Sequence, residues 1–272
     1  MHIEYALDQL SQGRSSKTIH NYYIRIRQIM KAALREKLIP TNPVDAVIPP
    51  RYEIKETCIM NTGEPQKAIN TLNNDTNPDA HMWQTMFTLA FATGMRQAER
   101  FGLTPSELIT IDGIHGIQIT HQLQHLTTNM TIPNWLNATH ITGNFYLLPP
   151  KTKQGKRFIP LNTQLWIDLN ALANTNCTKP TDLIFTRDGQ PLTSNVERRK
   201  WKQALQAAGL PYTTMRAARH FFSTHLAQTG ASEDARLAIM SHAKITTTAG
   251  YTHWTPAALA QYANQAREAV TQ

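Results

Sequence analysis

The stretch TGMRQAERFGL, residues 93–103, places Arg96 directly behind an apolar segment that ends at Gly94. Helices often end at glycine, because glycine adopts the left-handed backbone conformation at little cost. We therefore expect a helix over residues 79–93, with Arg96 just beyond its end. Such an arginine usually caps the helix or lies on the surface, so this stretch alone does not define a site.

Outward from this stretch, the chain reads as mainly helical with a small antiparallel β-sheet, an α+β fold class. Apolar residues spaced three and four apart, with Gly or Pro at the ends, predict helices over 17–37, 64–74, 194–208, 216–229 and 256–270. Alternating segments with turn residues predict short strands in SELITIDGIHGIQIT, FYLLPPKTKQGKRFIPL and DLIFT.

Prolines divide the chain into a small N-terminal part and a larger domain. Pro40 and Pro43 stop helical structure and open a linker. We predict a helical segment over residues 1–48 and a domain over residues 49–272. The first helix has an apolar stripe of Ile19, Tyr22, Ile26, Ile29 and Ala33, with basic residues largely off it: Lys17, Arg25, Arg27 and Lys31. A solvated face is the simpler interpretation of these charges, unless the rest of the chain acts on DNA.

Composition narrows the function classes. The 272 residues include 27 Lys plus Arg against 19 Asp plus Glu, a formal charge of +8, which favours a nucleic-acid partner. No apolar run approaches the roughly 20 residues of a membrane span, and MHIEYALDQL does not resemble a signal peptide. Cys58 and Cys177 lie far apart and outside any CxxC pair, which fits a reducing, cytoplasmic location without zinc or disulfides.

Three further segments carry groups suited to phosphodiester chemistry. Residues 151–161, KTKQGKRFIPL, predict a hairpin with a basic turn. Residues 215–226, MRAARHFFSTHL, place Arg216 and Arg219 one helical turn apart. In residues 240–254, MSHAKITTTAGYTHW, Tyr251 follows His242 by nine residues.

These groups could together cleave a phosphodiester without metal. Two arginines, Arg96 and Arg219, can grip the non-bridging oxygens and remain charged at any working pH. A tyrosine has a pKa of about 10, so Tyr251 needs a cationic setting or a base to act as nucleophile. A hairpin lysine can protonate the leaving 5′ oxygen. No acidic cluster suited to two Mg²⁺ ions is evident. Taken singly, Tyr251 is more often a packed aromatic and the basic residues surface charges.

The order and spacing of these segments resemble the tyrosine recombinases, or phage integrase family. TGMRQAERFGL resembles the first-arginine box of that family, RHFFSTHL the second, and MSHAKITTTAGYTH the histidine segment followed by the tyrosine. KTIHNYYIRIRQIMKAALREKLIPTNPVDAV is similar to the last helix of its core-binding domain. The resemblance spans residues 17–265 and implies a catalytic domain behind a partial core-binding domain.

The resemblance also implies roles. Tyr251 would form a 3′-phosphotyrosyl bond with double-stranded DNA, Arg96 and Arg219 would bind the phosphate, and His242 would orient it. Lys153, with Lys151 as the alternative, would be the general acid, while Glu99 would tether the Arg96 loop. Further DNA contacts would come from Lys17, Arg25, Arg27, Lys31, Lys156 and Arg157. The family needs no cofactor and works as four protomers on two duplexes, with residues 256–270 docking on a neighbour or packing on their own domain.

Three departures from the family pattern keep alternatives open. Arg216 stands where the family usually has histidine, and arginine does not act as a base. The spacing from the hairpin lysine to Pro160 differs from the usual one, and the part before the linker is about half the usual length. A DNA-binding relative without turnover, or a type IB topoisomerase, therefore stands beside the recombinase reading. The sequence does not identify the target site, nor integration as against excision.

Overall fold

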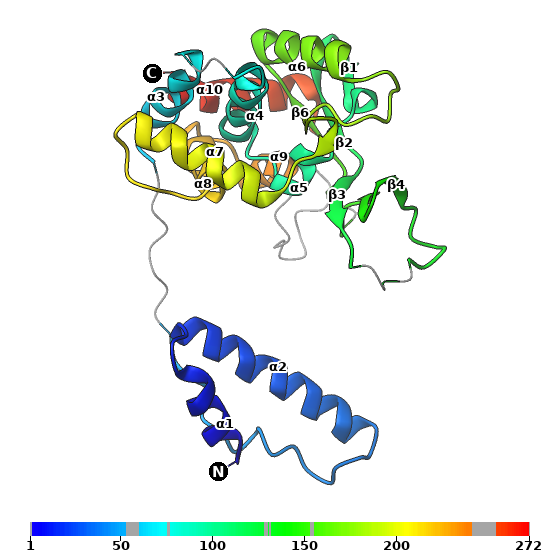
Figure 1. Ribbon diagram of the computed structural model, residues 1–272, viewed down its shortest axis with the longest axis vertical. Helices are drawn as coiled ribbons and strands as arrows, with labels where there is room; N and C mark the ends of the chain where they lie inside the picture. Colours follow the sequence, from blue (N-terminus) through cyan, green and yellow to red (C-terminus); the bar gives the residue numbers. More distant parts are fainter. Residues whose placement is uncertain are drawn as a thin grey trace. The chain divides into compact units, whose positions relative to one another are not determined.

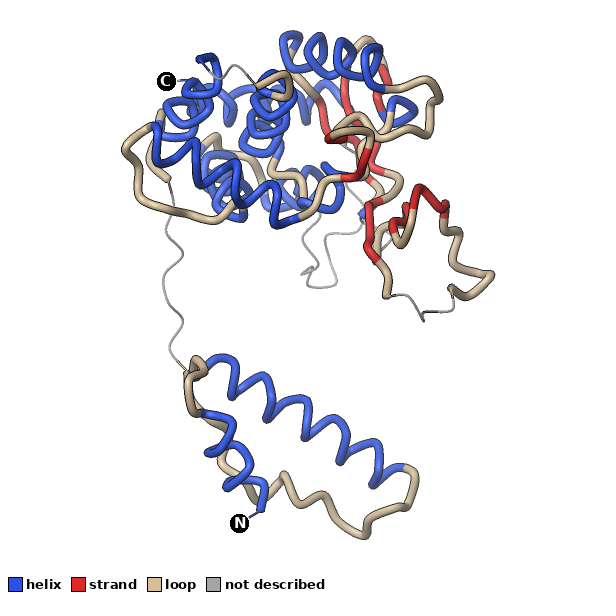
Figure 2. Tube along the Cα trace, viewed as in Figure 1, coloured by secondary structure: helices blue, strands red, loops and turns tan. Residues whose placement is uncertain are grey.

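The computed structural model describes residues 2–52, 60–74, 77–127, 130, 132–152, 155–240 and 254–271. The chain divides into two compact units, residues 1–57 and 58–272 (Figures 1 and 2). The boundary predicted after residue 48 therefore lies inside the first unit. Within the described part, no helix is both long and apolar enough to cross a membrane.

The first unit packs two helices, α1 (His2–Ser11) and α2 (Ser16–Arg35). Ser15 caps α2 by accepting a hydrogen bond from the Thr18 N–H at 3.3 Å. The core of the unit consists of Leu7, Ile19, Tyr23, Val44 and Val47. Helix α1 was not predicted, and Ile29 of the predicted stripe is 64% exposed. The ten-residue α1 is half as long as α2, so it cannot cover the whole stripe.

The second unit is built around α4 (Ala80–Thr93), most of whose residues are buried. Helices α3 (Glu64–Asn70), α6 (Thr163–Asn176), α8 (Arg216–Gln228) and α10 (Pro256–Thr271) pack against it, as does the 3₁₀ turn Thr71–Asn74. Helix α7 (Ser194–Ala207) inserts Trp201 between Phe87 and Phe91, at ring-centroid distances of 5.1 and 5.5 Å. The predicted helices in this unit are present, whereas α6 was not predicted.

The main sheet has the order β1-β2-β6 and is antiparallel, with β1 at Leu108–Ile111, β2 at Ile114–Ile119 and β6 at Arg157–Pro160. Ile117 pairs with Leu108 on one side and with Ile159 on the other. Asp112 and Gly113 join β1 to β2 with positive φ angles of 50° and 77°. Such angles form the type I′ turn that suits the twist of a two-residue hairpin.

A second antiparallel sheet, in the order β3-β5-β4, contains β3 (Gln122–His125), β4 (Thr139–Thr142) and β5 (Phe145–Leu148). Strands β5 and β6 thus belong to different sheets, so the predicted hairpin around residues 151–161 is wrong. DLIFT is not a strand either: Ile184 is buried, while the two-residue strand β7 (Thr186–Arg187) begins after it and pairs with β8 (Gln190–Pro191). The apolar residues of this run are buried, but they do not pair with a neighbouring strand.

Three short helices and the last helix complete the unit. Helix α5 (Gln97–Phe101) and the 3₁₀ turn Pro105–Glu107 lead into β1, and α9 (Glu233–Met240) follows α8. On α10, Leu259, Ala263 and Ala266 are buried in one cluster with α8 and α9. The Arg267 guanidinium on α10 donates to the carbonyl oxygens of Ala92 and Pro160. The apolar stripe of residues 256–270 therefore packs on its own unit in this structure.

Candidate functional site

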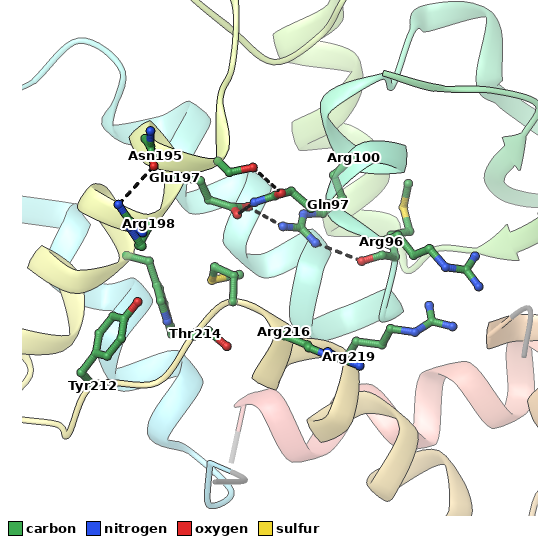
Figure 3. Close-up of a pocket in the computed structure, with 14 residues that line it drawn as sticks. Arg96, Gln97, Arg100, Asn195, Glu197, Arg198, Tyr212, Thr214, Arg216 and Arg219 are labelled. Carbon is green, nitrogen blue, oxygen red and sulfur yellow. Dashed lines mark hydrogen bonds and ion pairs between the residues drawn. The ribbon is translucent and has the colours of Figure 1, made fainter. Parts of the chain in front are cut away.

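A pocket of about 510 Å³ lies between α5, α7 and the start of α8 (Figure 3). Of the described residues, one carboxylate, Glu197, and five arginines line it: Arg96, Arg100, Arg198, Arg216 and Arg219. A concave surface with this excess of guanidinium groups attracts an anion with several oxygens, such as a phosphate. The pocket thus has the charge expected for phosphodiester chemistry.

Arg96 occupies the N-cap position of α5, with extended backbone angles of φ −67° and ψ 151°. Glu99, one turn later, accepts hydrogen bonds at 2.8 Å from both the Arg96 backbone N–H and its Nη1. The Arg96 side chain is 42% exposed, whereas that of Glu99 is 2% exposed. The buried carboxylate therefore orients the arginine while the guanidinium reaches the pocket, which agrees with the tethering role expected for Glu99.

Arg157 on β6 is the second arginine that binds the Glu99 carboxylate. Its Nη1 and Nη2 donate to the two Glu99 oxygens at 3.0 and 2.8 Å, and its Nε donates to the Ile239 carbonyl at 2.8 Å. Burial alone would raise the pKa of the Glu99 carboxyl, but the hydrogen bonds and charge of Arg157 and the bonds from Arg96 outweigh it and lower this pKa to about 2. Glu99 is consequently a permanent anion near neutral pH.

The buried position of Arg157 corrects one sequence prediction. We expected Arg157 to contact DNA from the turn of a hairpin, but it is 6% exposed and paired with a carboxylate. A guanidinium held this way has no free face for a phosphate. Lys151 and Lys156 are exposed, as a DNA contact or proton donor requires. Lys153, the favoured general acid, lies outside the described residues.

Arg219 reaches the pocket from α8. Its Nη1 donates to the Gly94 carbonyl at 2.6 Å and its Nη2 to the Met240 carbonyl. Burial and, after it, the positive charges of Arg96, Arg157 and Arg216 lower the pKa of Arg219 to about 10, although the Glu99 carboxylate opposes this shift. The group therefore stays protonated at neutral pH among like charges, so a bound anion would relieve their repulsion.

Gly94 is required where it stands, because φ is +61° and a Cβ would lie 2.9 Å from Met240 Sδ. The glycine that ended the helix in the sequence thus also presents a carbonyl to Arg219. Arg96 and Arg219 come from different elements, and Figure 3 shows their guanidinium groups directed toward the same region. The two arginines predicted to bind one phosphate are brought together.

The remaining predicted residues fall into three groups. Arg216 is exposed at the start of α8 and lines the same pocket. His242 and Tyr251 lie outside the described residues, although the Met240 carbonyl, two positions before His242, binds Arg219. The four DNA contacts predicted in the first unit are all exposed on α2: Lys17, Arg25, Arg27 and Lys31. Arg27 is paired with Asp45 at 3.4 Å.

Helix α7 supplies pocket residues that the sequence reasoning did not select. Asn195 and Arg198 lie on the pocket wall, with the Arg198 Nη2 donating to Asn195 Oδ1 at 3.1 Å. The signal that could have found Arg198 is the basic run ERRKWK, residues 197–202, in a predicted helix ahead of the second-arginine segment. A basic amphipathic helix is a common DNA-facing element. Within the described residues, no group of three or more His, Cys, Asp or Glu is placed to hold a metal ion.

Comparison with known proteins identifies a matching family and several similar sequences and structures. The model of the phage integrase family matches residues 60–257. Tyrosine recombinase XerD of Staphylococcus haemolyticus (strain JCSC1435) is 26% identical over 263 residues, covering 94% of this chain and 78% of the relative. The structure of the Tn1549 transposon integrase with transposon right end DNA has a TM-score of 0.71 at 24% identity, covering 94% of this chain and 81% of that one. XerH site-specific recombinase bound to difH substrate has a TM-score of 0.60 at 17% identity, covering 89% and 64%.

Proposed function

The chain belongs to the phage integrase family and is a tyrosine-type site-specific DNA recombinase; from this premise we propose that Tyr251 cuts double-stranded DNA by forming a 3′-phosphotyrosyl bond. The observation that carries the proposal is the convergence of Arg96 and Arg219 on one pocket. Their guanidinium groups are placed to hold the non-bridging oxygens of the scissile phosphate. The charge that gathers on these oxygens in the transition state strengthens both contacts.

The covalent step requires a nucleophile and a proton donor. The Tyr251 oxygen attacks phosphorus and gives its proton to solvent, while the bond from phosphorus to the 5′ oxygen breaks and that oxygen takes a proton from the general acid. The positive potential of the arginines favours the phenolate that must form. In the second half of the reaction, a 5′ hydroxyl from another strand attacks the phosphotyrosine and releases Tyr251. The phosphodiester bond energy is kept in the adduct, so no ATP is consumed.

A basic residue after β5 is the proposed proton donor, with Lys153 favoured and Lys151 as the alternative. Replacing the general acid by alanine should slow cleavage by about 100-fold or more, because the 5′ alkoxide leaves poorly without a proton. A substrate whose 5′ bridging oxygen is replaced by sulfur should restore the rate, since a thiolate leaves unprotonated.

Measured as single-turnover rates on both substrates, Lys153→Ala and Lys151→Ala distinguish the two candidates. Only the general-acid variant should be rescued by sulfur. Lys156→Ala, exposed nearby on the same segment, is the control: it removes a proposed DNA contact and not the proton donor, so sulfur should not rescue any loss that it causes. Rescue of neither lysine variant would contradict the assignment.

Double-stranded DNA is the proposed partner of both units. The exposed cations on α2 and Lys156 can each replace a counterion on the phosphate backbone. We further propose a homotetramer on two synapsed duplexes, because exchange requires four strand cuts and each protomer supplies one Tyr251. Sedimentation of the protein with its site-bearing DNA should yield a complex of four protomers with two duplexes. A strict monomer on synapsed DNA would contradict the assembly.

Covalent trapping tests the proposed function directly. The protein is incubated with DNA taken from the flanks of its own gene and nicked near each candidate position, so that cleavage releases a short fragment and the adduct cannot religate. A protein–DNA band that survives denaturation supports the enzyme. Because Arg216 stands in place of the usual histidine, a DNA-binding relative without turnover is the second candidate. Specific binding without any adduct would favour it.

A further inference from the structure

Glu197 is a buried carboxylate on a helix with an otherwise basic exposed face. Its side chain is 1% exposed, and both of its carboxylate oxygens accept hydrogen bonds from residues of α5. Oε1 accepts a hydrogen bond from Arg100 Nη2 and Oε2 one from Gln97 Nε2. Arg100 is itself only 3% exposed, so this is an ion pair removed from water. Buried groups of this kind hold one arrangement when all their partners are in place.

The two partners of Glu197 flank Arg96 in the chain. Arg100 also donates through Nη1 to the carbonyl of Met95 at 2.9 Å, the residue immediately before Arg96. Gln97 immediately follows Arg96, and its Oε1 accepts a hydrogen bond from Ser194 Oγ of α7 at 2.7 Å. Figure 3 shows this chain of contacts running across the pocket. The residues on both sides of Arg96 are thereby linked to α7, Gln97 through its side chain and Met95 by way of Arg100.

Two carboxylates therefore determine where Arg96 lies. Glu99 binds the arginine itself, and Glu197 binds its neighbours. Glu99 is part of the first-arginine segment, whereas Glu197 comes from an element far along the chain. The same helix α7 presents Asn195 and Arg198 on the pocket wall. A ligand on that wall would therefore contact the helix that binds the neighbours of Arg96.

We propose that Glu197 is a positioning residue for DNA cleavage: with Arg100 and Gln97 it makes α7 and the Arg96 segment one rigid body. DNA seated against Asn195 and Arg198 would then set the position of the phosphate-binding guanidinium. The inference rests on the proposed function of the pocket. A misplacement of about 1 Å in such a group can reduce a reaction rate about 100-fold without weakening binding.

The test replaces the ion pair by apolar residues of similar size, Arg100→Met with Glu197→Met. Such exchanges commonly preserve stability because no charge is left unpaired. We expect the double variant to unfold at the wild-type temperature and to bind DNA with wild-type affinity. Its single-turnover cleavage of saturating nicked DNA should fall roughly 10- to 100-fold. Glu197→Gln, which keeps the shape of the side chain, should show a smaller loss, and it provides the test if the double variant does not fold.

A double-mutant cycle separates positioning from general support. Arg96→Lys keeps a charge and residual cleavage, and combining it with the apolar pair should cost little beyond Arg96→Lys alone, because both act on the same contact. Gln206→Ala, exposed on α7 beyond the basic run, should cleave at the wild-type rate. The inference would be overturned if the losses from Arg96→Lys and from the apolar pair multiplied, or if the apolar pair cleaved at the wild-type rate. In either case, an adduct formed by the wild type would still support the proposed function. No adduct in the wild type would overturn both.

Discussion

Tyr251→Phe should form no detectable covalent adduct with nicked DNA, a loss of at least about 10⁴-fold in cleavage. Phenylalanine keeps the ring but lacks the oxygen that would bond to phosphorus. Specific DNA binding should remain close to that of the wild type, because a single hydroxyl adds little to an interface dominated by phosphate contacts. The measurement is a denaturing gel of protein incubated with labelled substrate, beside a binding assay on the same samples.

The matched control is Tyr212→Phe. Tyr212 lines the pocket and is 49% exposed, so it is an accessible tyrosine in the described part of the chain. This variant should form the adduct at the wild-type rate. An adduct that persists in Tyr251→Phe and disappears in Tyr212→Phe would identify Tyr212, in the loop after α7, as the nucleophile. Mass spectrometry of the peptide linked to DNA identifies the tyrosine in either case.

The second large effect concerns Glu99. Replacing it by leucine leaves the guanidinium of Arg157 buried without a carboxylate, and we expect the second unit to lose about 3 to 5 kcal/mol of unfolding free energy. Arg96 loses its orienting partner at the same time, so the cleavage rate should fall as well. Urea denaturation measures the first effect and single-turnover cleavage the second.

A double variant distinguishes the two consequences. Glu99→Leu with Arg157→Met removes both buried charges, so it should regain most of the lost stability. Cleavage should remain impaired, since nothing then orients the Arg96 guanidinium. Recovery of full cleavage in the double variant would show that Glu99 serves stability alone. Glu233, an exposed carboxylate on α9, is the control: Glu233→Gln should change the stability far less.

Glu99 should also make the stability of the folded protein depend on pH in acid. The folded pKa of Glu99 is about 2, below its ordinary value of 4.5, so the folded state binds this proton less tightly than the unfolded state. Its contribution to stability is complete above about pH 4.5 and is lost as the pH falls toward 2, by about 3 kcal/mol in total. The acid sensitivity between these values should be reduced in Glu99→Leu with Arg157→Met.

Local signals in the sequence predicted much of the fold. The 3–4 spacing of apolar residues and the glycines at helix ends located α2, α7 and α8 to within a few residues, and alternation with a Asp-Gly turn located β1 and β2. These features depend on neighbours within a turn or a hairpin, so they can be read from short windows. The order of the boxes likewise selected Arg96 and Arg219 before any geometry was available.

What only the tertiary structure decided depends on contacts between distant segments. Periodicity shows that a side chain is buried but not what it meets, so Arg157 looked like a DNA contact until Glu99 was seen against it. Three other features depend on contacts between distant segments in the same way. They are the separation of β5 from β6, the packing of α10 on its own unit, and the bonds from Glu197 to the neighbours of Arg96. The sequence by itself identified three arginines of the pocket, Arg96, Arg216 and Arg219. The pairing of buried charges determined where its arginines lie, because such a pair forms only when the fold brings its two halves together.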